Sequence, residues 1–513
     1  MYRRVVVLQP VARRPSARAA KHAQRAKPPA TNPCAPGQAG GQYQPLTSDE
    51  VQRIYQQSLR ILDEIGMADV PQVLLKQALG QGAKVNDLGR LCYPPPMVEK
   101  IIAGACKQFT FYGRDPKHDI EVGGDKVYYG TGGAAVQTLD LESGQYRPST
   151  LNDLYDFTRL VDQLPNVAWF TRCCVATDVL DLYELDVNTV YALLRGTTKP
   201  IATSFTLPEH VDPIVDMFDM ALGGEGEFVK RPFCKAHISP VISPLKYGED
   251  AVAVALACMK RGVPISNIVA AMTGATSPAP LAGTLALTLA ETLAALVMVN
   301  VFEPGYPMIF SNWPLVIDLR TGAFRGGGGE MALLNAASAQ LSNALGLPSG
   351  CGSSMSDAKA PDAQMGMEKA ITSLACGLAG GNMVYESAGM MASLLGVSFE
   401  AFVMDDEMLS HVYRTIRGIE VTEENLAFDS ILAAVTGSGH FIDAATTMVS
   451  MERDYYYPKV ADREEPIVWQ ERGSLDHWAR AKTTAQRLLE NHPLYLDPQI
   501  DADIRAQYPI VLD

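Results

Sequence analysis

The sequence lacks several patterns that would assign it to a common class. It contains no Cys-x-x-Cys pair, no G-x-G-x-x-G segment and no Gly-Lys-Ser/Thr segment, although it has nine cysteines and 42 glycines. We therefore expect neither a disulfide framework nor a structural zinc site, and no common nucleotide-binding loop. Reduced thiols are typical of a cytoplasmic protein, and we expect that location.

Positive charge is scarce beyond the first residues. Residues 1–42 carry eight Lys/Arg and no Asp/Glu, whereas the remaining 471 residues carry 35 Lys/Arg against 57 Asp/Glu, a net charge of −22. Such an acidic body excludes a general nucleic-acid binder. The apolar run Val5–Leu8 is too short for a secretory signal. We expect residues 1–41 to form a disordered basic tail, with an organellar transit peptide as the alternative.

One stretch, Leu281–Phe302, is apolar over 22 residues and long enough to span a membrane. However, Glu291 lies near its middle, and Thr284, Thr288 and Thr292 recur at every fourth position. Charged and polar residues at helical spacing favour a buried helix of a large globular protein. We therefore expect no membrane association.

Helical patterns flank the central part of the chain. Thr47 and Glu50 form a capping box before a run with apolar residues on one face, and Gly66 ends that run. We assign residues 42–118 to an N-terminal helical subdomain, with a break at Pro94–Pro96. Residues 411–513 read as a helical extension followed by a charged, tyrosine-rich tail.

Between these flanks, eight short β-prone runs recur, each followed by a helical segment. Their starts are 32 to 43 residues apart, the length that a parallel strand with its crossover helix requires. Eight such units close a (βα)₈ barrel, which we predict over residues 119–410. An open doubly wound sheet is the alternative. The expected strands are Lys126–Tyr129, Val167–Val175, Ile201–Ser204, Phe233–His237, Ile265–Val269, Met308–Ser311, Ser349–Gly352 and Met383–Glu386.

The carboxyl ends of these strands provide the candidate site residues, because function in such barrels is located there. Aromatic rings at these ends would attract a quaternary ammonium group, although ordinary barrel packing explains them equally well. Two carboxylates, as candidate catalytic groups, would add negative charge, or the second would pair with a neighbouring arginine. The expected catalytic residues are Glu386 and Asp318, and the expected substrate-binding residues are Tyr129, Phe205, His237, Asn312, Trp313, Arg320, Cys351 and Tyr385.

Three other patterns leave alternatives open. The glycine run before Glu330 could approach a planar cofactor or a phosphate, or form a lid or a tight packing turn. Cys173 and Cys174, with Cys351 and His237, could make a zinc site, but no local ligand pair supports one, and we predict no metal. Lys235 shares a face with His237 and could form a Schiff base.

A group of motifs in the second half of the chain resembles the trimethylamine methyltransferase family. The motifs are Ser311–Pro314, Asp318–Ala323, the glycine run to Glu330, Gly346–Pro348 and Ser356–Lys369, and the likeness spans roughly residues 42–480. Founding members contain pyrrolysine in the seventh-strand region. Ordinary residues occupy that region here, from Gly350 to Ser353, and the usual Thr-Asp-Ser-Lys motif has lost a hydroxyl at Ala358. The chain is therefore similar to the non-pyrrolysine branch.

The resemblance implies a function in one-carbon metabolism related to methanogenesis. Members move a methyl group from a methylated amine to the Co(I) corrinoid of a separate small protein, and the non-pyrrolysine branch uses quaternary amines such as glycine betaine. The chain has no D-x-H-x-x-G cobalamin motif, so we expect the corrinoid in trans. We also expect a homo-oligomer. Trimethylamine or a sulfonium substrate, a Schiff-base lyase and a non-catalytic amine-binding protein are the alternatives.

Overall fold

The computed structural model describes residues 32–513. The expected basic tail therefore lies outside the described residues except for its last ten. Within these ten, β1 (Gln38–Ala39) pairs antiparallel with the first barrel strand. By their contacts, residues 34–417 and 458–513 form one compact unit, and residues 418–457, which we call the helical insert, belong to a second unit.

Eight parallel strands form a closed barrel in the first unit. Each strand pairs with the next along the chain, and the last pairs with the first. The predicted (βα)₈ barrel is thus confirmed, and seven of the eight strands begin at the predicted residue. The strands are β6 (Lys126–Gly130), β9 (Val167–Thr171), β10 (Ile201–Thr203), β11 (Cys234–Ile238), β14 (Ile265–Met272), β15 (Met308–Leu315), β16 (Ser349–Gly352) and β17 (Met383–Tyr385).

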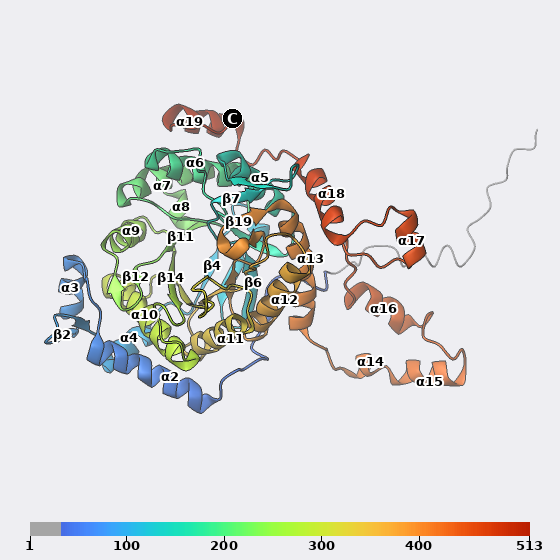
Figure 1. Ribbon diagram of the computed structural model, residues 1–513, viewed down its shortest axis with the longest axis horizontal. Helices are drawn as coiled ribbons and strands as arrows, with labels where there is room; N and C mark the ends of the chain where they lie inside the picture. Colours follow the sequence, from blue (N-terminus) through green and yellow to red (C-terminus); the bar gives the residue numbers. More distant parts are fainter. Residues whose placement is uncertain (1–31) are drawn as a thin grey trace, which may run out of the picture. The chain divides into compact units, whose positions relative to one another are not determined.

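One long helix follows each barrel strand, and these helices cover the outside of the strands (Figure 1). Both faces of the strands are buried, the inner by the barrel interior and the outer by the helices, as parallel sheets require. The helices are α5 (Leu151–Asp162), α6 (Leu182–Gly196), α7 (Val211–Leu222), α9 (Glu249–Lys260), α10 (Leu281–Phe302), α11 (Gly329–Ala344), α12 (Ala363–Leu378) and α13 (Phe399–Arg417).

The apolar helix α10 is buried in the protein, as predicted. It is long and apolar enough to cross a membrane, but 89% of its most apolar window is buried. Its Glu291 accepts hydrogen bonds from the Ser243 hydroxyl (2.6 Å) and the Leu245 backbone N–H (2.7 Å). The carboxylate therefore holds the loop that follows β11, rather than lying unpaired in an apolar segment.

The N-terminal segment packs on α10. Thr47 and Glu50 form the predicted capping box of α2 (Ser48–Arg60), which continues as a short π-helix to Ile65 and ends at Gly66. Ser58 donates a hydrogen bond to the carbonyl of Ala286 on α10. The remaining elements of this segment are α3 (Gln72–Leu79), β2 (Lys84–Val85), β3 (Leu91–Cys92), α4 (Pro95–Gly104), β4 (Gln108–Phe111) and β5 (Ile120–Gly123).

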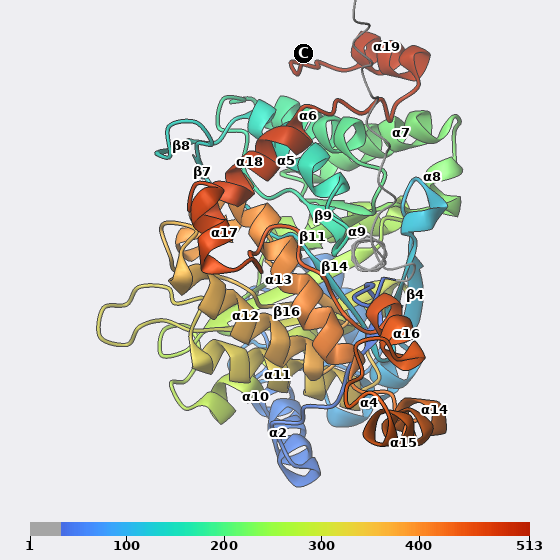
Figure 2. The ribbon, with the colours of Figure 1, turned by 90° about the vertical axis from the view of Figure 1, so that its right-hand side faces the viewer.

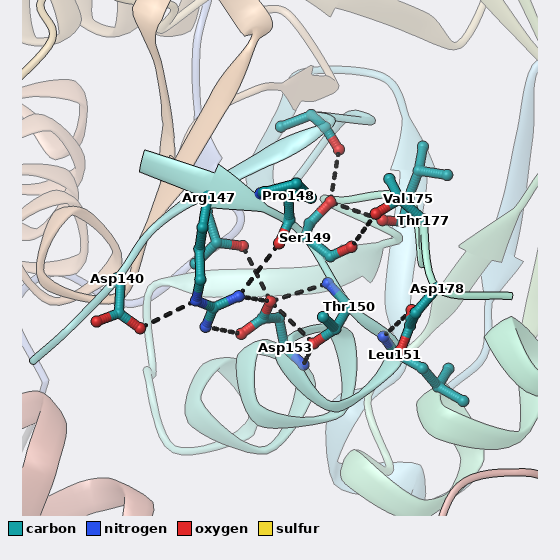
Figure 3. Close-up of polar contacts among 12 residues, drawn as sticks. Asp140, Arg147, Pro148, Ser149, Thr150, Leu151, Asp153, Val175, Thr177 and Asp178 are labelled. Atoms are coloured by element: carbon teal, nitrogen blue, oxygen red, sulfur yellow. Dashed lines mark hydrogen bonds and ion pairs between the residues drawn. The ribbon is translucent and has the colours of Figure 1, made fainter. Parts of the chain in front are cut away.

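Loops at the carboxyl ends of the first and last barrel strands join in a four-stranded sheet, the rim sheet. Its strands are β7 (Gln137–Leu139), β8 (Tyr146–Pro148), β18 (Met390–Met391) and β19 (Gly396–Ser398). Within the first of these loops, Arg147 binds Asp140 and, on α5, Asp153 (Figure 3). The Ser149 hydroxyl donates to the carbonyl of Val175, in the loop after β9 (2.6 Å). Three strand-to-helix loops are thereby held together at the mouth.

The end of the chain folds back onto the barrel helices. Helix α18 (His477–Leu489) lies beside α13 and α5 in both ribbon views (Figure 1, Figure 2). Arg159 of α5 donates to the carbonyls of Leu489 and Asn491, which fixes this end. The other C-terminal helices of the first unit are α17 (Pro466–Glu471) and α19 (Pro498–Gln507), and those of the helical insert are α14 (Glu423–Leu426), α15 (Phe428–Thr436) and α16 (Ala445–Arg453).

Candidate active site at the carboxyl ends of the barrel strands

Three predicted site residues meet inside the barrel. The rings of Trp313 and Tyr385 have centroids 5.1 Å apart, and His237 lies 5.9 Å from Trp313 and 5.8 Å from Tyr385. Trp169 adds a fourth ring, 5.4 Å from Tyr385. These residues come from β15, β17, β11 and β9, so the barrel wall converges on one aromatic cluster. His237 is partly exposed and the other three rings are buried.

Hydrogen bonds inside the barrel fix the Tyr385 ring. Its hydroxyl lies 2.8 Å from the Ser266 Oγ, which in turn lies 3.1 Å from the Ser311 Oγ. Ser311 and Trp313 are two residues apart on β15 and therefore face the same side of the strand. The chain of hydroxyls thus identifies the inner face of β14, β15 and β17.

Two cationic side chains, Lys235 and Arg172, adjoin the cluster. The Nζ of Lys235 lies 4.6 Å from the Tyr385 ring centroid, is buried and has no hydrogen-bond partner. Burial lowers the pKa of Lys235 to about 7. Burial, together with the charges of Lys235 and Arg172, lowers the pKa of His237 to about 3, so this imidazole is neutral at neutral pH.

Arg172 is the site residue that the sequence reading missed. It directly follows β9, and its side chain is half-buried. We expected that strand to extend to Val175, which placed Arg172 within the strand rather than at its carboxyl end. An arginine among apolar residues in the Val167–Val175 run was the signal that could have found it.

Glu386 directly follows Tyr385 at the end of β17, where a carboxylate was predicted. Its side chain is buried, and its Oε2 has no hydrogen-bond partner. Burial raises the pKa of Glu386 to about 7, although the Lys369 charge and the Gly133 N–H oppose this shift. A Cβ on Gly132 would lie 2.2 Å from Oε1 of Glu386, so only glycine leaves room for this carboxylate.

Tyr129 does not join the cluster, and the prediction that it lies at the mouth was wrong. Its ring packs edge-to-face on Tyr413 of α13 at 5.0 Å, and its hydroxyl donates to the carbonyl of Ser373 on α12 (2.8 Å). The register explains this, because Tyr129 pairs with Val384, the residue before the inward Tyr385. Phe205 is buried just beyond β10, and no aromatic ring pair among the described residues joins it to the cluster.

Asn312 and Cys351 occupy outward positions and are likewise not brought to the cluster. Asn312 lies between the inward Ser311 and Trp313. On either side of Cys351, Gly350 and Gly352 face inward, where a Cβ would collide with Ser311 and Trp313 respectively. Cys351 instead neighbours Cys376 of α12. Among residues 32–513, no group of three or more His, Cys, Asp or Glu side chains could hold a metal ion.

Asp318 and Arg320 bind each other rather than the cluster. The Asp318 carboxylate accepts hydrogen bonds from the Arg320 Nη2 (2.7 Å), Nε (3.1 Å) and backbone N–H (2.9 Å). These bonds hold the pKa of Asp318 well below its usual range. The pair lies in an exposed turn between β15 and α11, with the Arg320 side chain 87% exposed. Pairing with an arginine, one of the two roles expected for Asp318, is therefore the one that the geometry shows.

The glycine run before α11 is a packing turn. The Gly326 N–H donates to the Asp357 carboxylate (3.0 Å), and a Cβ on Gly327 would collide with the Glu368 side chain. Glu368 also accepts from the Ser356 hydroxyl (2.7 Å). The motifs around the glycine run and Ser356–Lys369 are thus bound to each other, which favours packing over a cofactor site.

Comparisons with known proteins agree with the motifs. The sequence profile of the family described as "Trimethylamine methyltransferase (MTTB)" matches residues 14–508. A glycine betaine methyltransferase of Desulfitobacterium hafniense is 30% identical over 92% of this chain and 97% of its own. The trimethylamine methyltransferase MttB of Methanosarcina thermophila is 31% identical over 90% of this chain and 95% of its own.

Among solved structures, the monomethylamine methyltransferase of Methanosarcina barkeri superposes on this chain with a TM-score of 0.46 and 14% sequence identity. The superposition covers 89% of this chain and 96% of the other chain. The family profile covers nearly the whole sequence, including every strand of the barrel and the residues of the aromatic cluster. The chain therefore belongs to the trimethylamine methyltransferase family.

Proposed function

We propose that this chain transfers a methyl group from a quaternary amine resembling glycine betaine to the Co(I) corrinoid of a separate small protein, in the cytoplasm. The observation that carries the proposal is the Trp313–Tyr385 ring pair inside the barrel. The buried Glu386 carboxylate directly follows Tyr385 at the end of the same strand and lies against Gly132 of the loop after β6. Aromatic faces and a carboxylate attract a quaternary ammonium, which has no N–H to donate.

The cations beside the cluster favour a substrate that also carries an anionic group. Lys235 is buried without a partner, and Arg172 is half-buried on the neighbouring wall. Two cations would repel a simple quaternary amine such as choline, but they would bind the carboxylate of a betaine. A neutral His237 can donate a hydrogen bond to that carboxylate without adding charge. The relative named a glycine betaine methyltransferase supports the same substrate class.

The chemistry requires positioning more than proton transfer. The tertiary amine that leaves a quaternary nitrogen is neutral, so no general acid is needed. The corrinoid of the partner supplies the nucleophilic acceptor for the methyl group. The cluster would hold the ammonium with one methyl exposed toward the mouth, and the buried rings would exclude water from the reacting centre. Asp318 and Arg320 have no part in this proposal, because they bind each other.

The test is methyl transfer by the purified chain to cob(I)alamin, followed by the absorbance of methylcobalamin. Glycine betaine, choline, trimethylamine and a sulfonium analogue such as dimethylsulfonioacetate form the panel. We expect glycine betaine to be used and choline, which keeps the ammonium and lacks the carboxylate, to be poor. No turnover with any compound, despite tight betaine binding, would instead support a binding protein. Borohydride trapping of a covalent adduct at Lys235 would support the Schiff-base lyase.

A further inference from the structure

Glu386 has a backbone conformation that residues with a Cβ rarely adopt. Its φ is 63°, in the left-handed region, although the residue is not glycine. Its carboxylate is buried, and Oε2 has no hydrogen-bond partner. Such conformations persist only where the surroundings fix the backbone, and they are concentrated at active sites. The contacts that fix this backbone therefore decide where the carboxylate lies.

Hydrogen bonds on both sides hold the segment that follows β17. The N–H of Ser387 donates to the carbonyl of Gly130 at the end of β6 (2.9 Å). The N–H of Gly389 donates to Oδ2 of Asp405 on α13 (2.8 Å). Gly389 has a φ of 81°, and a Cβ there would lie 2.3 Å from a ring carbon on α13, so only glycine fits. Asp405 is thus the side chain that holds the far end of this segment.

The same carboxylate oxygen of Asp405 binds a buried lysine. The Nζ of Lys369 on α12, the helix that packs beside α13 (Figure 1), lies 2.6 Å from Oδ2 of Asp405. The two side chains are 0% and 2% exposed. Two charges are costly to bury, and good geometry offsets that cost. The charge of Lys369 also acts on Glu386, so one ammonium serves two buried carboxylates.

We propose that Lys369 and Asp405 are a positioning pair for Glu386: Asp405 fixes the segment that carries Glu386, and Lys369 supplies the positive charge that stabilises its carboxylate. The inference rests on the proposed function, in which this carboxylate attracts the substrate ammonium. A lysine bonded directly to Glu386 would compete with the substrate. Because the Lys369 Nζ is bound to Asp405, its charge acts on Glu386 while Oε2 stays unpartnered.

The other charged and titratable groups near Glu386 do not replace Lys369. Among the described residues, the one charge that acts on the Glu386 carboxyl is that of Lys369. The two cations of the aromatic cluster, Arg172 and Lys235, act on the histidine of that cluster instead. Cys173 lies beside the loop after β6, but burial raises the pKa of its thiol well above the usual value, so it stays neutral.

Infrared difference spectra over a pH series follow the charge of Glu386 without turnover. They show the carbonyl band of its protonated carboxyl, and the same protein with Glu386→Gln lacks that band. The native midpoint should lie near pH 7, the pKa of Glu386. Lys369→Met should raise the midpoint by about one pH unit or more, because the stabilising charge is lost. Asp405→Asn should lower it, because a second negative charge is lost while Lys369 remains.

The opposite directions distinguish this role from a merely structural one. Removing one partner of a buried ion pair destabilises a fold, but such damage would not move the two midpoints apart. The double variant Lys369→Met, Asp405→Asn leaves neither charge unpaired and replaces any single variant that fails to fold. Its midpoint should lie above the native one, because the Lys369 charge is the one that acts on Glu386. Unchanged midpoints, or shifts of both single variants in one direction, would overturn the proposal.

Matched controls come from a second buried lysine and the next carboxylate along α13. Lys199 donates to three backbone carbonyls, and Asp406 accepts the N–H of Asn166 (2.8 Å). Lys199→Met and Asp406→Asn should each leave the midpoint of Glu386 unchanged. His477 of α18 also acts on Asp405, and His477→Gln should preserve the direction of both shifts. Circular dichroism establishes that each variant has folded.

Turnover separates this inference from the proposed function. If the chain demethylates glycine betaine, the acid limb of kcat/KM should move with the infrared midpoint in both single variants. Shifted midpoints in a chain that transfers no methyl group would contradict the proposed function and support the pair. Native turnover with midpoints that do not shift would contradict the pair alone.

Discussion

The rings of Trp313 and Tyr385 lie 5.1 Å apart at a tilt of 55°, on strands separated by β16. The gap is kept open by Gly352 of β16, because a Cβ there would lie 2.6 Å from the Trp313 ring. The intervening strand therefore contributes no side chain between the rings, and the two aromatic residues face each other directly.

Trp313→Ala should strongly reduce betaine use. A desolvated cation–π contact contributes about 2 kcal/mol, so we expect kcat/KM to fall by about 30-fold or more. Trp313→Phe, which keeps an aromatic face, should recover part of the activity. Trp469→Ala removes a tryptophan of α17 outside the barrel and serves as the control. Equal loss in both alanine variants would contradict a role for Trp313 in binding.

The pH dependence of kcat/KM should be bell-shaped, with its maximum near pH 7. Glu386 has a pKa of about 7 and binds the ammonium only when deprotonated, so activity should fall as the pH drops below this value. Lys235 also has a pKa of about 7 and binds the carboxylate only when protonated, so activity should fall as the pH rises above it. Because kcat/KM reports the ionisation of groups in the free enzyme, the slope of each limb should approach a change in kcat/KM of about tenfold per pH unit.

Single variants assign the two limbs. Glu386→Gln should remove the acid limb and Lys235→Met the alkaline limb, each with reduced activity at the optimum. A native profile that is flat between about pH 6 and 8 would contradict both assignments. His237 should not contribute to either limb, because its pKa of about 3 lies well below this range.

The architecture could be predicted from the sequence further than the site could. Short β-prone runs at regular spacing located the eight strands, because each βα unit has a minimum length. The direction of each side chain could not be read, since strands buried on both faces show no alternation of polar and apolar residues. Tyr129 and Cys351 lie near strand ends as expected, and Asn312 lies within β15, yet one residue of register turns each of them away from the interior.

The same limit applies to the residues that do face the interior. Trp313 and Tyr385 differ from Asn312 and Tyr129 only in register, and nothing in composition separates the two pairs. Asp318 was misplaced for another reason: its strand extends to Leu315 instead of the predicted Ser311, and the exposed turn beyond it closes the Asp318–Arg320 ion pair. Pairing with a neighbouring arginine was one of the two roles expected for Asp318, and loop geometry, which the sequence pattern does not contain, decides between them.

Gly132→Ala should disable the site while the barrel persists. The added Cβ would lie 2.2 Å from Oε1 of Glu386, so the carboxylate must move or the loop must shift. Overpacking of this kind costs about 1–3 kcal/mol. We expect most of the activity to be lost and the unfolding midpoint to change little. Gly104→Ala, where a Cβ would meet nothing within 4 Å, is the matched control. Full activity of Gly132→Ala would exclude a role for the Glu386 position.

Asp153 should contribute more to the stability of the mouth than Asp140 does, although both bind Arg147 (Figure 3). Asp153 accepts two hydrogen bonds from Arg147, at 2.6 and 2.7 Å, and also the N–H of Thr150, the residue that caps α5. Its side chain is 6% exposed, whereas that of Asp140 is 25% exposed and Arg147 is 39% exposed, so solvent weakens the pairs on the arginine side.

Asp153→Ala should therefore lower the free energy of unfolding by about 2–3 kcal/mol, through loss of the cap and of a buried charged acceptor. Asp140→Ala should cost under about 1 kcal/mol, as exposed pairs do. Urea titration of both variants measures their free energies of unfolding. Equal losses would contradict the prediction, because the bonds of Asp153 in the cap of α5 would then add nothing beyond the pairing that both carboxylates make with Arg147.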